Sequence, residues 1–456
     1  MTSFQSHLMR GLCLLLTLTL IACGSGGAGN DTQKPSNSSA ATSSSISAVS
    51  YFDIKPVFPL VNSNLGGQNE TILKLIIDSS RGFGEPMSVS ANGVTLFKDG
   101  VIWKTEETLV PLETALLSEI EIIATTADGE SQSFPFIIGN SATSIGESIQ
   151  AIDIFFPVNS ENINAIDENK NRFVVYDFEQ SMFEEVYAAE NGSNTQSLRR
   201  AGHYLEGTSL LEKKSANETS LVLLDNSGDL ANYFDAQLNI NEPSGFFIDH
   251  NKDLLPSEGE LVAYVLDNNA DNPLVQWYLS GPYVGENYAV VISTDESTRL
   301  SASYSPLSVI QFDNSVLIAR EFSNEDSVSI GSLIKVDFTR RLNSYTAKAS
   351  HFASFERAGS RIIKPTAMAL NHDQTTLYIA DQDKIWAMDL TQESKPFELL
   401  TSSSIIPGKK GQGPRLGSSI TAMELHPEHD VLYIAAGAQG IMAVDLETGD
   451  RITVAK

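Results

Sequence analysis

The C-terminal third of this chain contains a set of short apolar runs that occurs twice in the same order. Thr366–Leu370 (TAMAL) returns as Thr421–Leu425 (TAMEL), 55 positions later. At the same offset, Leu377–Ala380 (LYIA) returns as Leu432–Ala435 with identical letters. A repeated unit of several short strands cannot bury its apolar faces alone, so it must stack on neighbouring copies of itself.

A third pair of runs completes the unit, because Ala387–Leu390 (AMDL) matches Ala443–Leu446 (AVDL). Repeats of about 40 to 50 residues with several strands each are typical of β-propeller blades. Fainter copies of the third run extend the series upstream, and their markers are Asp177, Asp225, Asp267, Asp337, Asp389 and Asp445. We therefore predict a β-propeller over residues 144–456. The spacing of the markers favours seven blades, with six as the alternative.

The last two units resemble the NHL- and YVTN-type propellers of exported bacterial proteins. The resemblance rests on Leu377–Asp381 (LYIAD) and Ala443–Gly449 (AVDLETG). Thr391–Glu393 departs from the usual Thr-Gly turn, and Ala436 stands where the family often has Asp. The resemblance implies an all-β fold that is often used for recognition.

A second β-rich module precedes the repeats. Asn92–Gly93, Asp99–Gly100 and Asp128–Gly129 separate short β-rich runs, and these dipeptides are strong hairpin signals. About 90 residues of this kind predict a small immunoglobulin-like β-sandwich over residues 51–143. Together with Trp103, the turns resemble the small sandwich domains that precede propellers in exported bacterial proteins.

The N-terminus has the layout of a secretory signal over residues 1–22. Arg10 supplies a positive charge, and Gly11–Ile21 is apolar but too short to span a bilayer. Leu20–Cys23 (LIAC) resembles the lipobox of bacterial lipoproteins, which implies cleavage before Cys23 and its acylation, for example with palmitate. An ordinary signal peptide that contains Cys and a membrane anchor are the alternatives. By the same resemblance, Gly24 implies the outer membrane, at its periplasmic face or at the cell surface.

Residues 23–50 are rich in Gly, Ser, Ala, Asn and Thr, with Ile46 and Val49 as the only large aliphatic residues. Such a segment buries too little apolar surface to offset its ordering entropy, so we expect a flexible tether. Cys13 and Cys23 are the two cysteines, so the mature domains would contain no disulfide. The formal net charge of −27 makes nucleic acid an improbable partner.

In this acidic chain, basic residues gather in the segments that lead from one predicted blade to the next. In propellers these segments crown one face around the central channel, so we hypothesise a cationic rim that binds an anionic group, such as a uronate or a partner's acidic segment. Solvated loop charges are the simpler alternative. The candidate ligand-binding residues are Arg199, Arg200, Arg357, Arg361, Lys364, Lys409, Lys410 and Arg415.

Two patterns resemble metal sites, but both fit turns better. His426–His429 (HPEH) falls between the first two strands of a repeat, where polar turn residues are expected. Asp267, Asn269 and Asp271 have the alternation of a calcium loop without its Gly and Glu. We therefore expect no cofactor, with a divalent ion such as calcium as the open alternative.

No nucleophile elbow, Walker-type loop or zincin motif occurs in the chain. The features together predict a lipid-anchored cell-envelope protein that binds a protein or glycan partner through its propeller. The alternative is an enzyme that uses the propeller channel, such as a lactonase or a polysaccharide-acting lyase or hydrolase.

Overall fold

A computed structural model gives the fold. It describes residues 52–456 with gaps at 80–83, 107, 114–116, 141–147, 158–159, 179–180, 190–196, 206–207, 215–218, 226–229, 232–239, 241–242, 255, 257–258, 268–271, 296, 301–305, 324–328, 342–343, 358–359 and 404–410. Residues 50–456 form one compact unit. Its regular elements are β-strands, which confirms the all-β prediction. Within the described ranges, no helix has the length and apolar character needed to cross a membrane.

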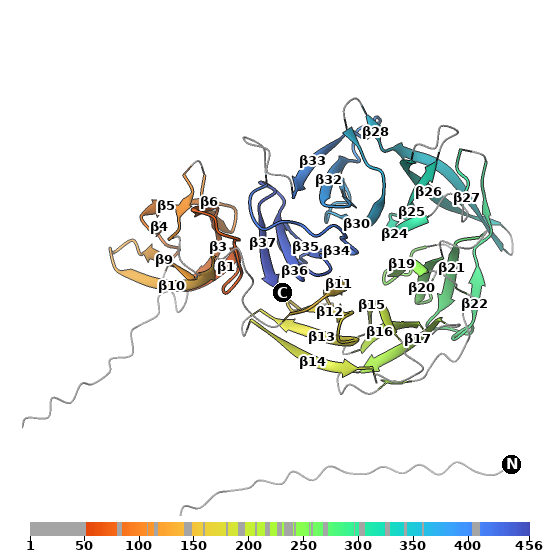
Figure 1. Ribbon diagram of the computed structural model, residues 1–456, viewed down its shortest axis with the longest axis horizontal. Coiled ribbons are helices and arrows are strands. Elements are labelled where there is room, and N and C mark those ends of the chain that lie inside the picture. The colour runs from red at the N-terminus through yellow and green to blue at the C-terminus, as the bar shows by residue number, and fades with distance from the viewer. Residues whose placement is uncertain are drawn as a thin grey trace, which may run out of the picture. The chain divides into compact units, whose positions relative to one another are not determined.

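Two four-stranded antiparallel sheets form a β-sandwich at the start of this unit (Figure 1). One sheet has the order β1-β3-β7-β6 and the other has the order β10-β9-β4-β5. The strands are β1 (Phe52–Phe58), β3 (Lys74–Ser79), β4 (Ser88–Ala91), β5 (Val94–Thr95), β6 (Phe97–Asp99), β7 (Ile102–Lys104), β9 (Leu117–Thr125) and β10 (Ser131–Gly139), with a separate pair of β2 (Glu70–Thr71) and β8 (Val110–Pro111). The sandwich is clear, whereas the immunoglobulin-like label stays a prediction.

The predicted hairpin turns are confirmed. Asn92–Gly93 joins β4 to β5, Asp99–Gly100 joins β6 to β7, and Asp128–Gly129 lies between β9 and β10. Asn92 and Gly93 have φ values of 46° and 82°. Positive φ at both central residues is required for a type I′ turn, whose twist matches that of the two strands in a two-residue hairpin.

Six further sheets form a ring, and each contains four consecutive antiparallel strands (Figure 1). We number these blades 1 to 6 in chain order. From the inner to the outer strand they are β11 (Ala151–Phe155), β12 (Ile163–Asp167), β13 (Arg172–Asp177) and β14 (Met182–Ala188); β15 (Ser197–Leu205), β16 (Thr208–Lys214), β17 (Thr219–Asp225) and β18 (Leu230–Ala231); β19 (Pro243–Ile248), β20 (Val262–Asp267), β21 (Leu274–Tyr278) and β22 (Asn287–Ala289); β24 (Pro306–Phe312), β25 (Ser315–Ser323), β26 (Ser329–Arg341) and β27 (Ser344–Ser354); β30 (Pro365–Leu370), β31 (Thr376–Asp381), β32 (Lys384–Asp389) and β33 (Phe397–Ser402); and β34 (Ala422–Leu425), β35 (Val431–Ala435), β36 (Ile441–Asp445) and β37 (Arg451–Ala455).

The described residues thus form six blades, so the seven favoured by the repeat spacing were wrong. Among its described residues, the long interval between Asp267 and Asp337 contains no additional sheet. Besides strands of blades 3 and 4, it holds the short β23 (Ile292–Ser293), which pairs in parallel with β27 of blade 4. Asp267 itself ends the second strand of its blade, whereas the other five marker aspartates lie on third strands.

Each interface between neighbouring blades has its own hydrophobic cluster among the described residues. Alternate residues of one strand serve opposite interfaces because strand side chains point to opposite faces. In β35, Leu432 and Ile434 pack toward blade 5, and Tyr433 packs toward blade 1. Both faces of such strands are buried, which explains their nearly continuous apolar runs. Tyr378 and Trp386 also pack between blades.

The ring closes where blade 6 meets blade 1. Gly437 donates a backbone hydrogen bond to the carbonyl of Ala151 (3.1 Å). The hydrophobic cluster at this closure also includes the sandwich core. Asn64, in a sandwich loop, exchanges backbone hydrogen bonds of 2.8 and 2.9 Å with Thr453 of β37.

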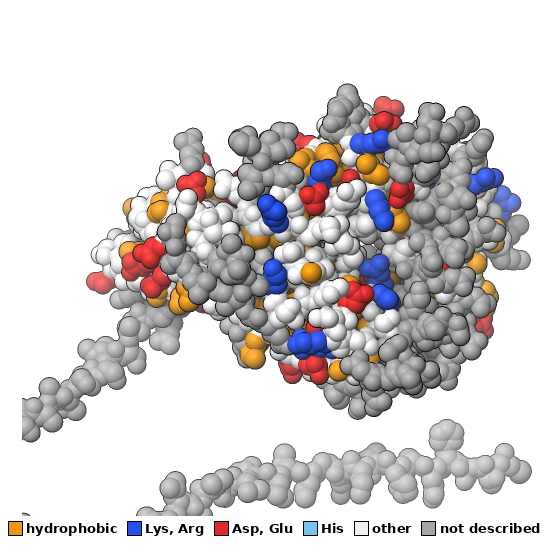
Figure 2. Space-filling view, viewed as in Figure 1, with side chains coloured by type: hydrophobic (Ala, Val, Ile, Leu, Met, Phe, Trp, Pro, Cys, Tyr) orange, Lys and Arg blue, Asp and Glu red, His pale blue; other side chains and the backbone are white. Residues whose placement is uncertain are grey.

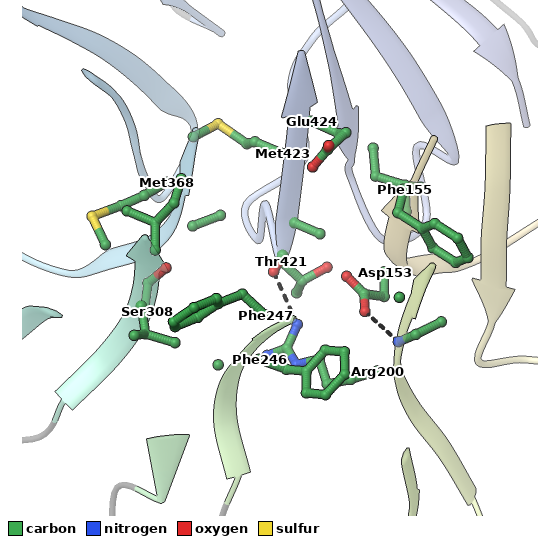
Figure 3. A pocket seen from close by; sticks show the side chains of 18 of the residues that line it. Asp153, Phe155, Arg200, Phe246, Phe247, Ser308, Met368, Thr421, Met423 and Glu424 are labelled. Atoms are coloured by element: carbon green, nitrogen blue, oxygen red, sulfur yellow. Dashed lines mark hydrogen bonds between the residues drawn. The ribbon is translucent and has the colours of Figure 1, made fainter. Parts of the chain in front are cut away.

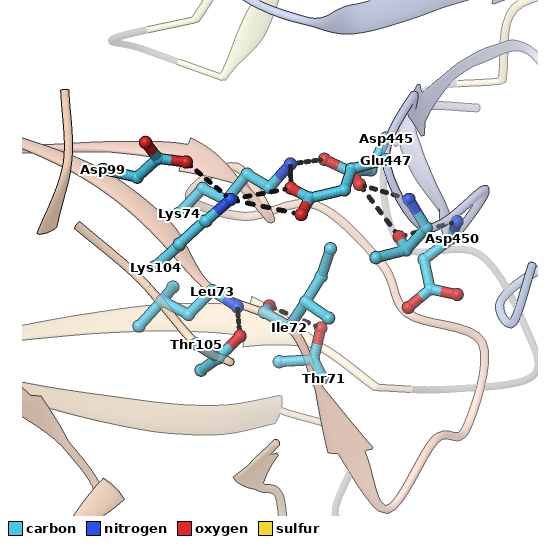
Figure 4. Close-up of polar contacts among 11 residues, drawn as sticks. Thr71, Ile72, Leu73, Lys74, Asp99, Lys104, Thr105, Asp445, Glu447 and Asp450 are labelled. Carbon is cyan, nitrogen blue, oxygen red and sulfur yellow. Dashed lines mark hydrogen bonds and ion pairs between the residues drawn. The ribbon is translucent and has the colours of Figure 1, made fainter. Parts of the chain in front are cut away.

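An ionic cluster joins the sandwich to the turn after β36 (Figure 4). The Lys74 ammonium lies 2.6 Å from the buried Asp445 carboxylate and 3.0 Å from Glu447. Lys104 reaches Glu447 at 3.1 Å and Asp99 at 2.9 Å. The two lysines lower the pKa of Glu447, chiefly through the hydrogen bond from Lys74. The sandwich is therefore attached to the propeller at the blade that closes the ring.

Candidate binding channel

The six inner strands β11, β15, β19, β24, β30 and β34 surround the middle of the ring (Figure 1). Five of them share one irregularity, a register shift at the start of the pairing with the second strand of the blade. A bulge of this kind redirects the side chain that follows it. The residues directly after the shift are Asp153, Arg200, Gly245, Ser308 and Ala367. All five line the same central cavity, so the bulge sets what the channel presents.

The cavity has a volume of about 350 Å³ and receives residues from all six blades. At this position blades 3 to 5 have Gly245, Ser308 and Ala367, and Ala422 of blade 6 is equivalent to Ala367, so small side chains leave room in the centre. Its walls are mostly apolar and come from Phe155, Phe246, Phe247, Met368 and Met423, as Figure 3 shows. A mostly apolar hollow with a few polar groups is the usual form of a small-molecule site.

Asp153 and Arg200 are the charged pair contributed by blades 1 and 2. Asp153 is 92% buried, and its Oδ2 accepts a hydrogen bond from the backbone N–H of Ala201 at 2.8 Å. The Arg200 guanidinium donates to the carbonyls of Thr421 (3.2 Å) and Ser244 (3.1 Å) and so bridges blades 2, 3 and 6 (Figure 3). Burial raises the pKa of Asp153 to about 6, and the charge of Arg200 opposes that rise.

Glu424 is the third charged residue of the cavity, two positions after Ala422 in β34. Its carboxyl has no hydrogen bond or ion pair with any described residue. Burial, with a smaller contribution from the charge of Asp153, raises the pKa of Glu424 to about 8. The buried Oγ1 of Thr421, in the same wall, also lacks a partner in the described part of the chain.

A second hollow of about 600 Å³ continues from the first. The two share four lining residues, which are Phe156, Ile310, Met368 and Glu424. We call these four residues the waist. Three of them are apolar, so Glu424 is the one ionisable group at the point that both hollows share.

The structure places the basic residues predicted to form a rim in different environments. Arg200 lies in the channel wall, and Arg199 of the same strand pairs with Glu168 at 3.0 Å. These two lie on inner strand β15, so their predicted position in a connecting segment was wrong. The bulge between Leu198 and Arg200 sends the neighbouring arginines to different environments.

The other rim candidates that the structure describes lie between blades. Arg357 and Arg361 belong to a small hairpin of β28 (Glu356–Arg357) and β29 (Ser360–Arg361) before blade 5, and the buried Nε of Arg361 has no partner in the described part of the chain. Lys364 and Arg415 are exposed, and Lys409 and Lys410 lie outside the described residues. On the face seen in Figure 2, Lys and Arg side chains form separate spots among acidic and uncharged ones.

The His426–His429 turn is an aromatic cluster in the structure. The two imidazole rings stack with centroids 4.5 Å apart, and Phe156 meets His426 edge-on at 5.2 Å. His426 Nδ1 accepts the backbone N–H of Glu428 at 3.1 Å, and burial lowers the pKa of His426 to about 4. In the described ranges, no three His, Cys, Asp or Glu side chains lie close enough to share a metal ion. Asn269 and Asp271 of the calcium-like pattern lie outside those ranges.

Asp153 and Glu424 were missed as candidate residues from sequence. A signal existed for Glu424, because it replaces Ala369 at the same position of an otherwise apolar repeated strand. Asp153 likewise interrupts the apolar run Ala151–Phe155. A carboxyl in a run that is buried on both faces is a candidate functional group.

No family model and no curated protein sequence matches this chain. Among solved structures, it is similar to an auxiliary nutrient binding protein from Bacteroides thetaiotaomicron, with 12% identity, coverage of 86% of this chain and 96% of that one, and a TM-score of 0.45. A protein of unknown function from the same organism gives 10% identity, 88% and 99% coverage, and a TM-score of 0.43. The Cps50 (Swd1) β-propeller domain from Myceliophteria thermophila has 9% identity, with coverage of 73% of this chain and 92% of that one, and a TM-score of 0.37.

Proposed function

We propose that this protein is a lipid-anchored binding protein of the cell envelope, which recognises a protein or glycan partner through its propeller. The observation that carries the proposal is the central cavity, into which all six blades place residues. Its apolar walls, with Asp153, Arg200 and Glu424 among them, suit the capture of one group that has both apolar and polar parts.

The channel can be tested by filling it. Ala422 is partly exposed on the cavity wall, so Ala422→Phe should place a ring in the open space. Native mass spectrometry of the full-length protein, after incubation with envelope extract and with a glycan panel, should show a bound mass with wild type that the variant loses. Val101→Phe, at a sandwich residue that is 71% exposed, is the control and should retain it. Equal retention by both variants of equal thermal stability would refute binding in the channel.

The anchor rests on Cys23, which lies outside the described residues. Cys23→Ser should give an unlipidated protein that no longer fractionates with membranes, because acylation requires the thiol. Metabolic labelling with a palmitate analogue measures the lipid directly. A variant that keeps both its label and its membrane fraction would disprove the lipobox interpretation.

The cationic rim remains a proposal for the connecting segments, where exposed Lys364 and Arg415 are the best placed of its described members. An anionic glycan should bind more weakly to the double variant Lys364→Ser, Arg415→Ser, and salt should weaken wild-type binding. Unchanged affinity in the double variant would leave these residues as solvated loop charges.

A second candidate function is supported by the two carboxyls in one cavity. Burial raises the pKa of both Asp153 and Glu424, and carboxyls with raised pKa values are typical general acids in hydrolases and lyases. Turnover of a lactone or polysaccharide panel that Glu424→Gln abolishes would favour the enzyme. Capture without turnover would favour the binding protein.

A further inference from the structure

Glu424 differs from the other charged groups of the cavity in having no partner. Asp153 accepts the Ala201 N–H, and Arg200 donates to two backbone carbonyls. The two nitrogens with which Arg200 makes these bonds are directed to blades 3 and 6, and the charge of Arg200 lowers the pKa of Asp153. The carboxyl of Glu424 therefore lies in an apolar waist without a cation from the described chain.

Burying a carboxylate without a counter-charge is costly, and a protein usually supplies a cation or leaves the group protonated. The residues beside Glu424 do not supply a cation, because the other three residues of the waist, Phe156, Ile310 and Met368, are apolar. With all three charged residues ionised, the cavity carries one net negative charge. A cationic occupant is the partner that would balance it.

We propose that the channel binds an organic cation, a primary ammonium group on an apolar body, with the ammonium at Glu424 and the body against the phenylalanine and methionine side chains of the cavity. This inference rests on the channel-binding function proposed above and names its ligand class. Aromatic faces attract cations, and methionine adapts to apolar groups of varied shape. Figure 3 shows the aromatic rings and thioethers that surround the space into which Glu424 points.

Proton linkage gives the proposal a distinctive signature. The titratable groups that face the same hollows or pair with the Glu424 strand are Asp153, Arg200, His250, His372 and Tyr433. Because the pKa of Glu424 is about 8, an ammonium ligand must displace its proton at neutral pH. Affinity should therefore rise about tenfold per pH unit up to that pKa, with release of about one proton per ligand.

The probe is 2-phenylethylammonium chloride, titrated calorimetrically into the full-length protein at pH 6, 7 and 8.5. Two buffers of different ionisation enthalpy report the proton released. The matched probes are 2-phenylethanol and phenylacetate, which keep the ring and replace the ammonium by a neutral or negative group. The matched variants are Glu424→Gln and Glu428→Gln, the second at an exposed glutamate of the same blade.

We expect the ammonium probe to bind at least about tenfold more tightly than the other two, with proton release, and Glu424→Gln to lose about tenfold or more while Glu428→Gln does not. Equal binding of 2-phenylethanol, binding that survives in Glu424→Gln, or no binding of the ammonium probe at millimolar concentration would overturn the ligand class. If the probe fails but Ala422→Phe still abolishes the bound mass seen with wild type, the channel-binding function stands. If neither test succeeds, both proposals fall.

Discussion

At the scale of residues, Glu424 shows how one substitution in a repeat changes a propeller channel. Glu424 pairs with Tyr433 as Ala369 pairs with Tyr378, so the two occupy the same position in blades 6 and 5. The alanine packs in an interface cluster, whereas the glutamate lies at the waist of the channel. The half-buried carboxyl is tolerated because desolvation raises its pKa and lets it remain protonated.

Glu424 should make the folded protein less stable as pH rises toward 8. The pKa of an unfolded Glu is near 4.5, and the folded value is about 8. Between these values the folded state binds more protons than the unfolded state, so stability falls with increasing pH. Between pH 6.5 and 8 we expect a loss of about 2 kcal/mol, which Glu424→Gln should remove. Urea unfolding across this range measures it.

Between pH 6.5 and 8, the neighbouring titratable groups Asp153 and His426 contribute little to the change in stability. Asp153 has a folded pKa of about 6, so its own contribution changes mainly below the window. Burial lowers the pKa of His426 to about 4, so the unfolded state binds more protons than the folded state between that value and about 6.5. The stability change due to His426 is therefore a gain with rising pH that is nearly complete by pH 6.5. Parallel stability curves for wild type and Glu424→Gln would show that Glu424 is not the titrating group.

At the scale of elements, Arg451 at the start of β37 fixes the segment that precedes blade 6. Its buried guanidinium donates to the carbonyls of Pro414 (2.8 Å), Gly411 (3.1 Å) and Gly413 (3.2 Å), and it also contacts the Thr401 hydroxyl. The planar fork of arginine reaches several acceptors at once. The Arg451 side chain therefore fixes the described end of the connection between β33 and β34, together with the hydrogen bonds of Gln412 to the Asp450 carboxylate (2.7 Å) and the Arg451 backbone (2.7 Å).

Arg451→Lys should release this segment. An ammonium reaches fewer of the three carbonyls, and each buried carbonyl left without a donor costs about 1–3 kcal/mol. We expect a stability loss of about 2–4 kcal/mol and faster tryptic cleavage near Arg415. Exposed Arg415→Lys keeps the cleavage site and should leave stability unchanged. Wild-type cleavage rates in the Arg451 variant would contradict the role given to Arg451.

The sequence predicted the last two blades well because their strands preserve the repeated letters in order. The earlier blades retain only apolar character, so Asp267, which ends a second strand, was aligned with third strands. The charged residues of the channel were harder to predict. Asp153 and Arg200 are brought together by bulges in two adjacent inner strands, and a bulge leaves no mark in hydrophobic periodicity.

At the scale of the whole described unit, Lys74 couples the sandwich to the propeller. Its partner Asp445 is completely buried, and the Asp445 Oδ1 is already used by the backbone and hydroxyl of Thr448 at 2.9 Å each. The ammonium of Lys74 is therefore the counter-charge of the other oxygen. The sandwich contributes a charge that the last blade needs.

Lys74→Met should destabilise the unit because it leaves the Asp445 carboxylate buried without its cation. Removing one partner of a buried pair costs about 3–5 kcal/mol. Lys98→Met removes the exposed pair with Glu85 and should cost about 1 kcal/mol or less. Urea unfolding followed by tryptophan fluorescence compares the two. Similar losses would show that the Lys74 pair is no more than a surface contact.

Ring closure has an entropic consequence. Blades 1 to 6 follow one another along the chain, but the contact between blade 6 and blade 1 joins residues almost 300 positions apart, such as Ala151 and Gly437. Bringing distant segments together costs an entropy that grows with the logarithm of the loop length. At this contact, residues of blades 1 and 6 share one hydrophobic cluster with the sandwich core. The backbone hydrogen bonds between Asn64 and Thr453 add a second link between the sandwich and blade 6. The sandwich thus stabilises the blade interface with the largest closure entropy. Partial unfolding of the ring should therefore begin between blades 6 and 1 when the contacts of the sandwich are weakened.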